Sequence, residues 1–204
     1  MSLVIVHTEV GNIGSVANMC RRIGADPIVS RDPEVIEQAT KLLLPGVGAF
    51  DPAMDYLNRT GLREALDRQF AAQVPILAIC LGMQLLLESS EEGTLPGLGW
   101  IPGEVRHLRR THGDELRVPN MGWAPISSVS YNPLFDGTPA DARYYFVHSY
   151  AAVPSNDQHI VATAEYGGPF VAAIAIENVT GVQFHPEKSH RYGKALIRRF
   201  VEDG

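Results

Sequence analysis

Short apolar runs and amphipathic stretches alternate along the first half of the chain. The apolar runs are rich in Leu, Ile and Val and have the length of buried strands. Asp32-Pro33 and Asp51-Pro52 each place a helix-capping aspartate before a proline suited to the first helical turn, so helices are expected to begin at both. Together these patterns predict strands at 3–6, 27–30, 41–44 and 74–79, and further helices at 13–23, 62–72 and 82–90.

From Gly93 onward, proline and glycine become frequent and β-type stretches follow one another. The alternating units of the first half imply a mostly parallel open sheet with helices on both faces, and the later hairpin-like strands add an antiparallel portion. The fold class is therefore α/β, and without a repeat or linker residues 1–204 are expected to form a single domain. The later stretches predict strands at 104–108, 144–153, 160–166, 170–176 and 181–184, and a closing helix at about 192–201.

Composition and charge narrow the range of functions. The chain has 45% hydrophobic and 20% charged residues, typical of a globular protein, and a net charge of −6. Its basic residues are scattered, which argues against nucleic acid or an anionic membrane surface as a partner. No basic leader is present, and Gly82 and Gln84 interrupt the most apolar stretch, so neither a signal peptide nor a membrane span is expected. We expect a cytoplasmic location, where a free thiol survives.

Cys80 is one of 2 cysteines and lies where a strand-like run becomes helix-like. A turn of this kind strains its central residue and needs small residues two positions away, which Ala78 and Gly82 provide. The N-terminus of the following helix would favour a thiolate. The segment fits a nucleophile and a buried structural cysteine about equally well, whereas Cys20 has the mid-helix position of a core residue.

His185 and Glu187 follow another apolar strand and are two residues apart. In extended backbone they face the same side, so the carboxylate could hold the imidazole in one tautomer. A lone His-x-Glu is more often an ordinary strand end. A zinc site is the weaker rival because the other histidines lack paired spacing, and no metal site is predicted.

The glycines of PGVG, residues 45–48, form a third candidate feature. Gly46 and Gly48 allow backbone conformations that point amide N–H groups at a developing negative charge. A phosphate loop is the alternative, but the stretch lacks the Gly-Lys-Ser/Thr ending of a P-loop. A thiol, a histidine with its carboxylate and a set of oxyanion donors together form a complete apparatus for acyl transfer.

These segments resemble a known family. AICLGMQ, residues 78–84, is similar to the nucleophile segment of the class I, triad-type glutamine amidotransferases, and GVQFHPEKS, residues 181–189, to their histidine–glutamate segment. The segments LLLPGVGAF, SSEEG, PNMGW and YFVHSY are most similar to the glutaminase subunits of imidazole glycerol phosphate synthase. The resemblance spans nearly the whole chain and implies the flavodoxin-like form of the α/β sheet.

The resemblance also implies roles for individual residues, with no cofactor. Cys80 corresponds to the nucleophile, His185 to the general base and acid, and Glu187 to its orienting partner. The remaining correspondences are oxyanion stabilisation by Gly46, Val47, Gly48 and Leu81, contact with bound L-glutamine by Gln84, and a place near the site for His148 and Ser149.

A partner protein is implied in the same way. In the family, ammonia passes into a cyclase subunit with a (β/α)₈ barrel, which forms imidazole glycerol phosphate and an aminoimidazole carboxamide ribotide in histidine biosynthesis. The two subunits form a heterodimer, and the partner docks over the glutaminase site. The corresponding docking candidates are Asn12, Met121, Trp123 and Lys188. Trp123 also suits an aromatic interface anchor, although a packing role is nearly as plausible.

One departure from the family pattern leaves the identity of the ammonia acceptor open. The first strand is followed by His7-Thr8-Glu9 where the family usually has Asp-Tyr-Gly. The same glutaminase chemistry could therefore serve a different synthase, such as one that amidates surface sugars. A non-catalytic binding subunit is disfavoured by the intact Cys80, His185 and Glu187, and an unrelated cysteine hydrolase would not account for PNMGW.

Overall fold

The computed structural model describes residues 2–8 and 12–203, so Glu9, Val10 and Gly11 of the departing segment lie outside the described residues. The elements of the first half are β1 (Leu3–Val6), α1 (Ile13–Arg22), β2 (Ile28–Ser30), α2 (Pro33–Glu37), β3 (Lys41–Gly46), α3 (Phe50–Thr60), α4 (Leu62–Ala71), β4 (Ile76–Cys80), α5 (Leu81–Gln84) and β5 (Leu87–Ser90). Those of the second half are β6 (Ile101–His107), α6 (Leu108–His112), β7 (Asn120–Pro125), β8 (Ser127–Ser128), β9 (Arg143–His148), β10 (Tyr150–Pro154), β11 (Ile160–Glu165), β12 (Pro169–Ile176), β13 (Val179–Val182) and α7 (His190–Asp203), with 3₁₀ turns at Pro133–Phe135, Asp157–His159 and Pro186–Lys188.

In the described part of the chain, the central sheet has 8 strands in the order β2-β1-β3-β4-β13-β12-β11-β8. Neighbouring strands from β2 through β13 are parallel, and those from β13 through β8 are antiparallel. The predicted α/β class, with its antiparallel portion, is therefore confirmed. Because β4 lies between β3 and β13, the carboxyl ends of these three strands meet at one edge of the sheet, where sites form in this class.

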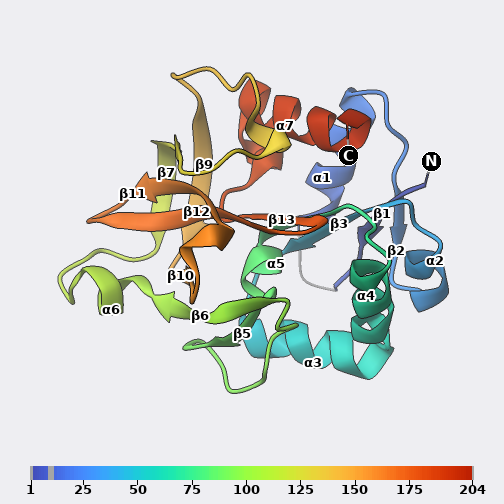
Figure 1. The fold of residues 1–204 in the computed structure, drawn as a ribbon, viewed down its shortest axis with the longest axis horizontal. Helices are drawn as coiled ribbons and strands as arrows, with labels where there is room; N and C mark the ends of the chain where they lie inside the picture. Colours follow the sequence, from blue (N-terminus) through green and yellow to red (C-terminus); the bar gives the residue numbers. More distant parts are fainter. Residues whose placement is uncertain (1, 9–11, 204) are drawn as a thin grey trace.

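Helices cover both faces of the central sheet (Figure 1). One apolar core lies under α1 and α7 and contains the fully buried Leu43, while the other lies under α2, α3 and α4 and contains Leu42 and Leu44. Successive residues of β3 thus enter opposite cores, as expected for a strand that is buried on both faces. Cys20 is fully buried in the first core, where the sequence places it.

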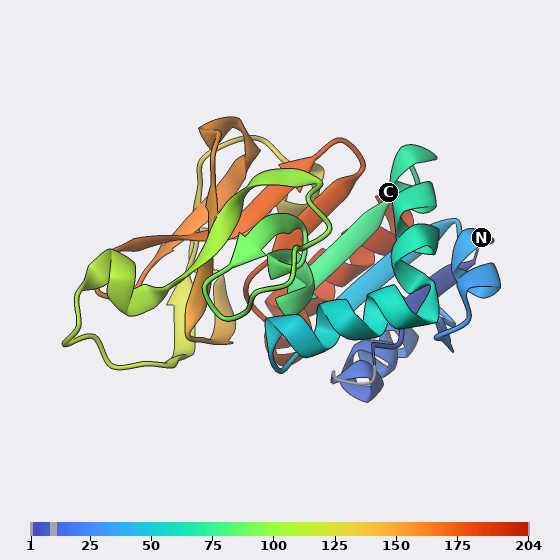
Figure 2. The same cartoon turned by 90° about the horizontal axis from the view of Figure 1, so that it is seen from below.

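The remaining strands form two small sheets, β10-β6-β5 and β7-β9. They gather at one end of the molecule, drawn from green to orange in Figure 2, away from the helices of the first half. The predicted strand 144–153 is two strands, because the backbone leaves β9 at His148 and re-enters β10 at Tyr150. These additions bring segments from the second half of the chain to the edge where β3, β4 and β13 end.

Asp32 and Asp51 have different roles in the structure. Asp32 caps α2 as predicted, since its side chain accepts a hydrogen bond from the N–H of Glu34. The predicted cap at Asp51 is wrong: α3 begins at Phe50, and Asp51 instead accepts hydrogen bonds from Thr94 and the N–H of Leu95. A carboxylate distant in sequence, Glu92, accepts from the Phe50 N–H at 2.9 Å and replaces the local cap.

The predicted helix at 82–90 is also wrong over most of its length. The helix α5 is a single turn, and the chain then enters β5. The carbonyls of residues 85–88 accept hydrogen bonds from the backbone of residues 97–101, and Leu87 and Ser90 pair with β6. Pairing with distant segments therefore overrides the local helical pattern, and the helix after Cys80 is too short to supply the predicted dipole.

Candidate active site

Cys80 lies on a strained turn between β4 and α5. Its backbone has φ 54° and ψ −108°, a region that side chains rarely adopt. Gly82 makes the turn possible, because a Cβ atom there would lie 1.9 Å from the carbonyl oxygen of Leu44. A Cβ at Gly46 would likewise lie 2.9 Å from the Gly82 nitrogen. The turn can therefore present the thiol at the sheet edge because β3 and the start of α5 approach each other at glycines.

His185 and Glu187 form a buried pair after β13. His185 Nδ1 lies 2.7 Å from Glu187 Oε1, and only 2% of each side chain is exposed. The carboxylate fixes the proton on Nδ1, and Nε2 is buried without a hydrogen-bond partner among the described residues. The second carboxylate oxygen, Oε2, also has none within the same part of the chain, so the charge of Glu187 is directed at the imidazole.

The environment of His185 favours its protonated form. Burial alone would lower the pKa of His185, but interactions with Cys80 and Glu187 outweigh it and raise the pKa to about 9. A thiol and a carboxylate on either side of an imidazole are the arrangement that supports a thiolate–imidazolium pair. The geometry can therefore supply a nucleophile and a proton donor together.

Cys80 and His185 line the same pocket, which has a volume of about 610 Å³. The candidates from the sequence that line it are Asn12, Val47, Gly48, Cys80, Leu81, Gln84, His148, Ser149, His185 and Lys188. Gly46 does not line it: Gly46 pairs with Cys80 in the sheet and packs against Leu81. Of the glycine segment, Val47 and Gly48 thus border the pocket, and Gly48 has φ 101°.

Gln84 is buried at the pocket with its amide direction fixed. Its Nε2 donates to the backbone carbonyl of Tyr150 and to Gln183 Oε1, each at 3.1 Å. A backbone carbonyl can only accept, so the NH₂ group of Gln84 must point this way and its Oε1 remains for other contacts. Among the described residues, none donates a hydrogen bond to that oxygen.

His148 lines the pocket but is held as a neutral structural residue. Its Nδ1 donates to the Tyr150 carbonyl at 2.8 Å, and its Nε2 accepts from Asn120 Nδ2 at 3.1 Å. Burial lowers the pKa of His148 to about 4; nearby His185 adds to this effect, and the bond to Tyr150 opposes it. With both nitrogens occupied, His148 joins β7, β9 and β10 around the site.

The buried neutral His148 predicts an acid-sensitive stability. Its pKa is about 4 in the folded protein against an ordinary value of 6.5, so only the unfolded chain takes up the proton between these values. The stabilisation is complete above pH 6.5 and is lost as the pH falls towards 4. We expect the free energy of unfolding, measured by urea denaturation, to fall from pH 6.5 to 5, and His148→Gln to flatten that slope. An equal slope in the variant would contradict this.

Three polar side chains at the site were not singled out from the sequence. Gln183 is fully buried, and its Nε2 lies 3.7 Å from Cys80 Sγ as a hydrogen-bond donor. Glu92 and Tyr150 border the pocket. Burial raises the pKa of Glu92, Asp51 adds to the effect, and the hydrogen bond from Phe50 opposes it. The position of Gln183 two residues before His185, on the same side of an extended strand, was the available signal.

The docking candidates differ in exposure. Met121 and Trp123 have 62% and 41% of their surface exposed, and both lie on β7. The Trp123 indole stacks on the exposed His190 ring, with centroids 5.2 Å apart. Asn12 and Lys188 border the pocket, and the Lys188 ammonium lies 5.6 Å from the centre of the Tyr145 ring. Two of the four candidates thus border the pocket, and the other two are exposed on a nearby strand.

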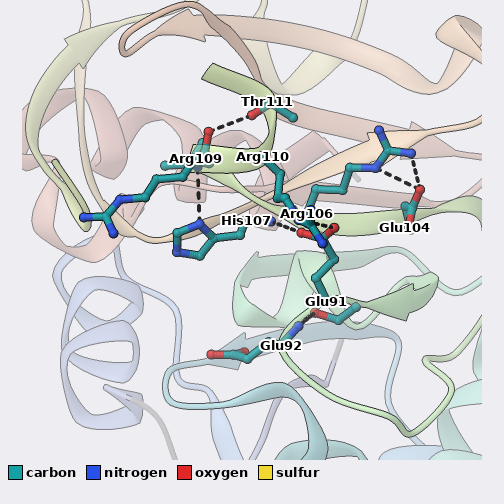
Figure 3. A network of polar contacts seen from close by, with 10 residues as sticks. Glu91, Glu92, Glu104, Arg106, His107, Arg109, Arg110 and Thr111 are labelled. Carbon is teal, nitrogen blue, oxygen red and sulfur yellow. Dashed lines mark hydrogen bonds and ion pairs between the residues drawn. The ribbon is translucent and has the colours of Figure 1, made fainter. Parts of the chain in front are cut away.

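A charged network on β6 and α6 lies next to Tyr150, which lines the pocket (Figure 3). Glu91 accepts from the His107 N–H at 2.8 Å and pairs with Arg110, and His107 Nδ1 accepts from the Arg109 N–H. The His107 ring packs edge-on against Tyr150, with centroids 5.0 Å apart. The network therefore holds the pocket rim at Tyr150 against the segment that carries Glu92.

Comparison with known proteins places this chain in a family. The family profile described as "Glutamine amidotransferase class-I" matches residues 6–203. A curated relative from Bdellovibrio bacteriovorus, named imidazole glycerol phosphate synthase subunit HisH, is 47% identical over 97% of this chain and 98% of its own. One from Pseudomonas aeruginosa, named subunit HisH 2, is 47% identical over 98% of each chain. The HisH 2 subunit of Methanococcus maripaludis is 42% identical over the same shares.

Solved structures of low identity share the fold. The structure described as PurLQS from Thermotoga maritima superposes with a TM-score of 0.74, at 17% identity over 98% of this chain and 97% of that one. A glutamine amidotransferase from Thermotoga maritima gives a TM-score of 0.63 at 18% identity, over 98% of this chain and 96% of its own.

Two further observations concern residues 2–8 and 12–203. No group of three or more His, Cys, Asp or Glu side chains is arranged to hold a metal ion. None of the helices in this part of the chain has the length and apolar character needed to cross a membrane.

Proposed function

This chain belongs to the class I glutamine amidotransferases, and within them to the HisH subunits of imidazole glycerol phosphate synthase; on this premise we propose that it releases ammonia from L-glutamine at Cys80 and delivers it to a cyclase subunit. The observation that carries the assignment of residues is the buried His185–Glu187 pair, whose histidine lines the same pocket as the strained Cys80. This combination of nucleophile, proton carrier and orienting carboxylate is able to hydrolyse the side-chain amide of glutamine.

In the proposed reaction, the Cys80 thiolate attacks the side-chain carbonyl of glutamine. Protonated His185 then donates its proton to the departing ammonia, which leaves a thioester on Cys80. Neutral His185 next takes a proton from water, which hydrolyses the thioester to glutamate. N–H groups of Val47, Gly48 and Leu81 are the donors available to the oxyanion, since these residues border the pocket beside Cys80.

Two side chains are suited to hold the amino-acid end of the substrate. The Glu92 carboxylate borders the pocket, and although one oxygen accepts from Phe50, a carboxylate has further lone pairs for an ammonium group. Gln84 Oε1 is the second acceptor, with its direction fixed by the bond to Tyr150. These acceptors would distinguish glutamine from a simple amide that lacks the α-ammonium group.

The proposed partner is a (β/α)₈ barrel cyclase that binds over the pocket in a heterodimer and uses the ammonia to form imidazole glycerol phosphate. Exposed Met121 and Trp123 follow Pro119, which lines the pocket, and would form the apolar part of the contact. The segment His7-Thr8-Glu9 departs from the family pattern, so the same ammonia chemistry for another synthase is the second candidate.

A glutamate-release assay tests the proposal. The protein is measured alone, with a histidine-pathway cyclase subunit, and with that cyclase plus its ribulosyl ligand. We expect strong stimulation by the liganded cyclase. Glutaminase activity that is unchanged by this cyclase but stimulated by a sugar-amidating synthase would overturn the proposal that the cyclase is the ammonia acceptor. Absence of glutamate release under every condition would overturn the enzymatic function itself.

A further inference from the structure

Gln183 occupies a position beside the nucleophile that the proposed reaction leaves unused. It follows β13 directly, one residue beyond Val182, which pairs with Ile79 of β4. Its side chain is completely buried, and so is that of Phe184. The Gln183 side chain is directed at Cys80 Sγ, and His185, two residues further on, also interacts with Cys80.

The hydrogen bonds determine which end of the Gln183 amide faces the sulfur. The Tyr150 carbonyl can only accept, so it fixes the NH₂ group of Gln84. That NH₂ group also donates to Gln183, which must therefore turn its Oε1 towards Gln84. The Nε2 of Gln183 is left facing Cys80 Sγ at 3.7 Å. A backbone carbonyl thus orients two amides in series and places an N–H donor at the sulfur.

We infer that Gln183 is a positioning residue that holds the Cys80 sulfur and stabilises its anionic form through the Nε2–H donor, with Gln84 and the Tyr150 carbonyl fixing its direction. In this arrangement the sulfur has His185 on one side and an uncharged donor on another. The donor needs no proton transfer of its own, so it favours the thiolate both before attack and when the thioester breaks.

The inference rests on the proposed function in taking Cys80 as the nucleophile, but its consequence for the thiol is measurable without glutamine. Hydrogen bonds to charged groups are worth more than neutral ones, and loss of one typically costs about a factor of ten or more. Gln183→Met removes the donor at nearly constant volume, and Gln84 keeps its bond to Tyr150. We expect the pH profile of Cys80 alkylation by iodoacetamide to move about one unit upward in this variant.

Gln69 supplies a matched control. It is also a buried glutamine, with 4% exposure, and its Nε2 donates only to the backbone carbonyls of Ile36 and Ala39 among the described residues. Gln69→Met should lower the thermal unfolding midpoint but leave the alkylation profile of Cys80 unchanged. Glutamate release with the cyclase should fall about tenfold in kcat for Gln183→Met and little for Gln69→Met.

A second measurement needs no variant. In the wild-type protein, the side-chain amide ¹H and ¹⁵N resonances of Gln183 should move when Cys80 is alkylated by iodoacetamide, while those of Gln69 stay constant. Wild-type alkylation behaviour in Gln183→Met, or Gln183 resonances that are as insensitive as those of Gln69, would overturn the inference. Lack of glutaminase activity in the wild type, with these thiol results intact, would instead count against the proposed function.

Discussion

Cys80→Ala should lower glutamate release by roughly 10⁴- to 10⁶-fold, because no other group among the described pocket residues can form the thioester. The turn should tolerate the change, since alanine is smaller than cysteine and the strain at φ 54° is already present. Activity is measured with the liganded cyclase, and cyclase binding is measured separately by calorimetry. The variant should retain binding, because the loss concerns the reacting atom alone.

The other cysteine is the matched control. Cys20 is completely buried in α1, and burial raises the pKa of its thiol to about 11, so it is unreactive near neutral pH. Cys20→Ala should keep glutaminase activity within about a few-fold of wild type, with some loss of stability from the small cavity. Equal activity losses in the two variants would contradict the assignment of Cys80 as the nucleophile.

Glu187→Gln should lower kcat by roughly 10³- to 10⁴-fold. The amide side chain introduced at position 187 can donate a hydrogen bond to His185 Nδ1. It would thereby stabilise the tautomer of His185 that carries its proton on Nε2, which cannot act as the base. It also removes the negative charge that helps to raise the pKa of His185 to about 9, so the imidazolium form should be lost at lower pH. In the steady-state pH profile of kcat, measured with the liganded cyclase, the alkaline limb, where His185 loses its proton, should therefore move to lower pH.

An exposed carboxylate on α4 provides the comparison. Glu64→Gln makes the same chemical change on the surface, away from the residues that line the pocket, and should leave both kcat and its pH profile unchanged. If Glu187→Gln retained wild-type kcat and pH profile, the carboxylate would have no part in orienting His185.

The sequence predicted the family of the chain and every strand of the central sheet except the two-residue β8. Runs such as Leu3–Val6 and the stretch from Lys41 are buried on both faces, and this makes them continuous enough to recognise. The comparisons confirm the resemblance to class I glutamine amidotransferases and to HisH subunits. Motifs with several fixed residue types, such as GVQFHPEKS, carry more information than periodicity does.

The errors occurred where distant segments compete with local preference. Residues 85–90 have a helical pattern, but the backbone of residues 97–101 and β6 take up their hydrogen bonds. At α3, a carboxylate from Glu92 replaces the local cap expected of Asp51. Neither partner can be assigned from sequence, because each depends on how β5 and β6 fold back onto the first half of the chain.

For the candidate site, the sequence pointed to most of the side chains that line the pocket but not to how they bond. The sequence motif drew attention to His185 and Glu187 but not to Gln183. The direction of the Gln183 amide depends on Gln84 and on the Tyr150 carbonyl, which come from other segments. His148 was expected near the substrate, yet its ring nitrogens are both bonded to the protein. Burial and bonding of this kind emerge only when β7, β9 and β10 are assembled.

The close approach of Gly82 to the Leu44 carbonyl has a mechanical consequence. A Cβ atom at position 82 would lie 1.9 Å from that oxygen, so any side chain larger than hydrogen there would force the end of β3 and the nucleophile turn apart. Because Cys80 lies only two residues before Gly82, such a separation would also displace the thiol from the edge of the sheet at which His185 lies.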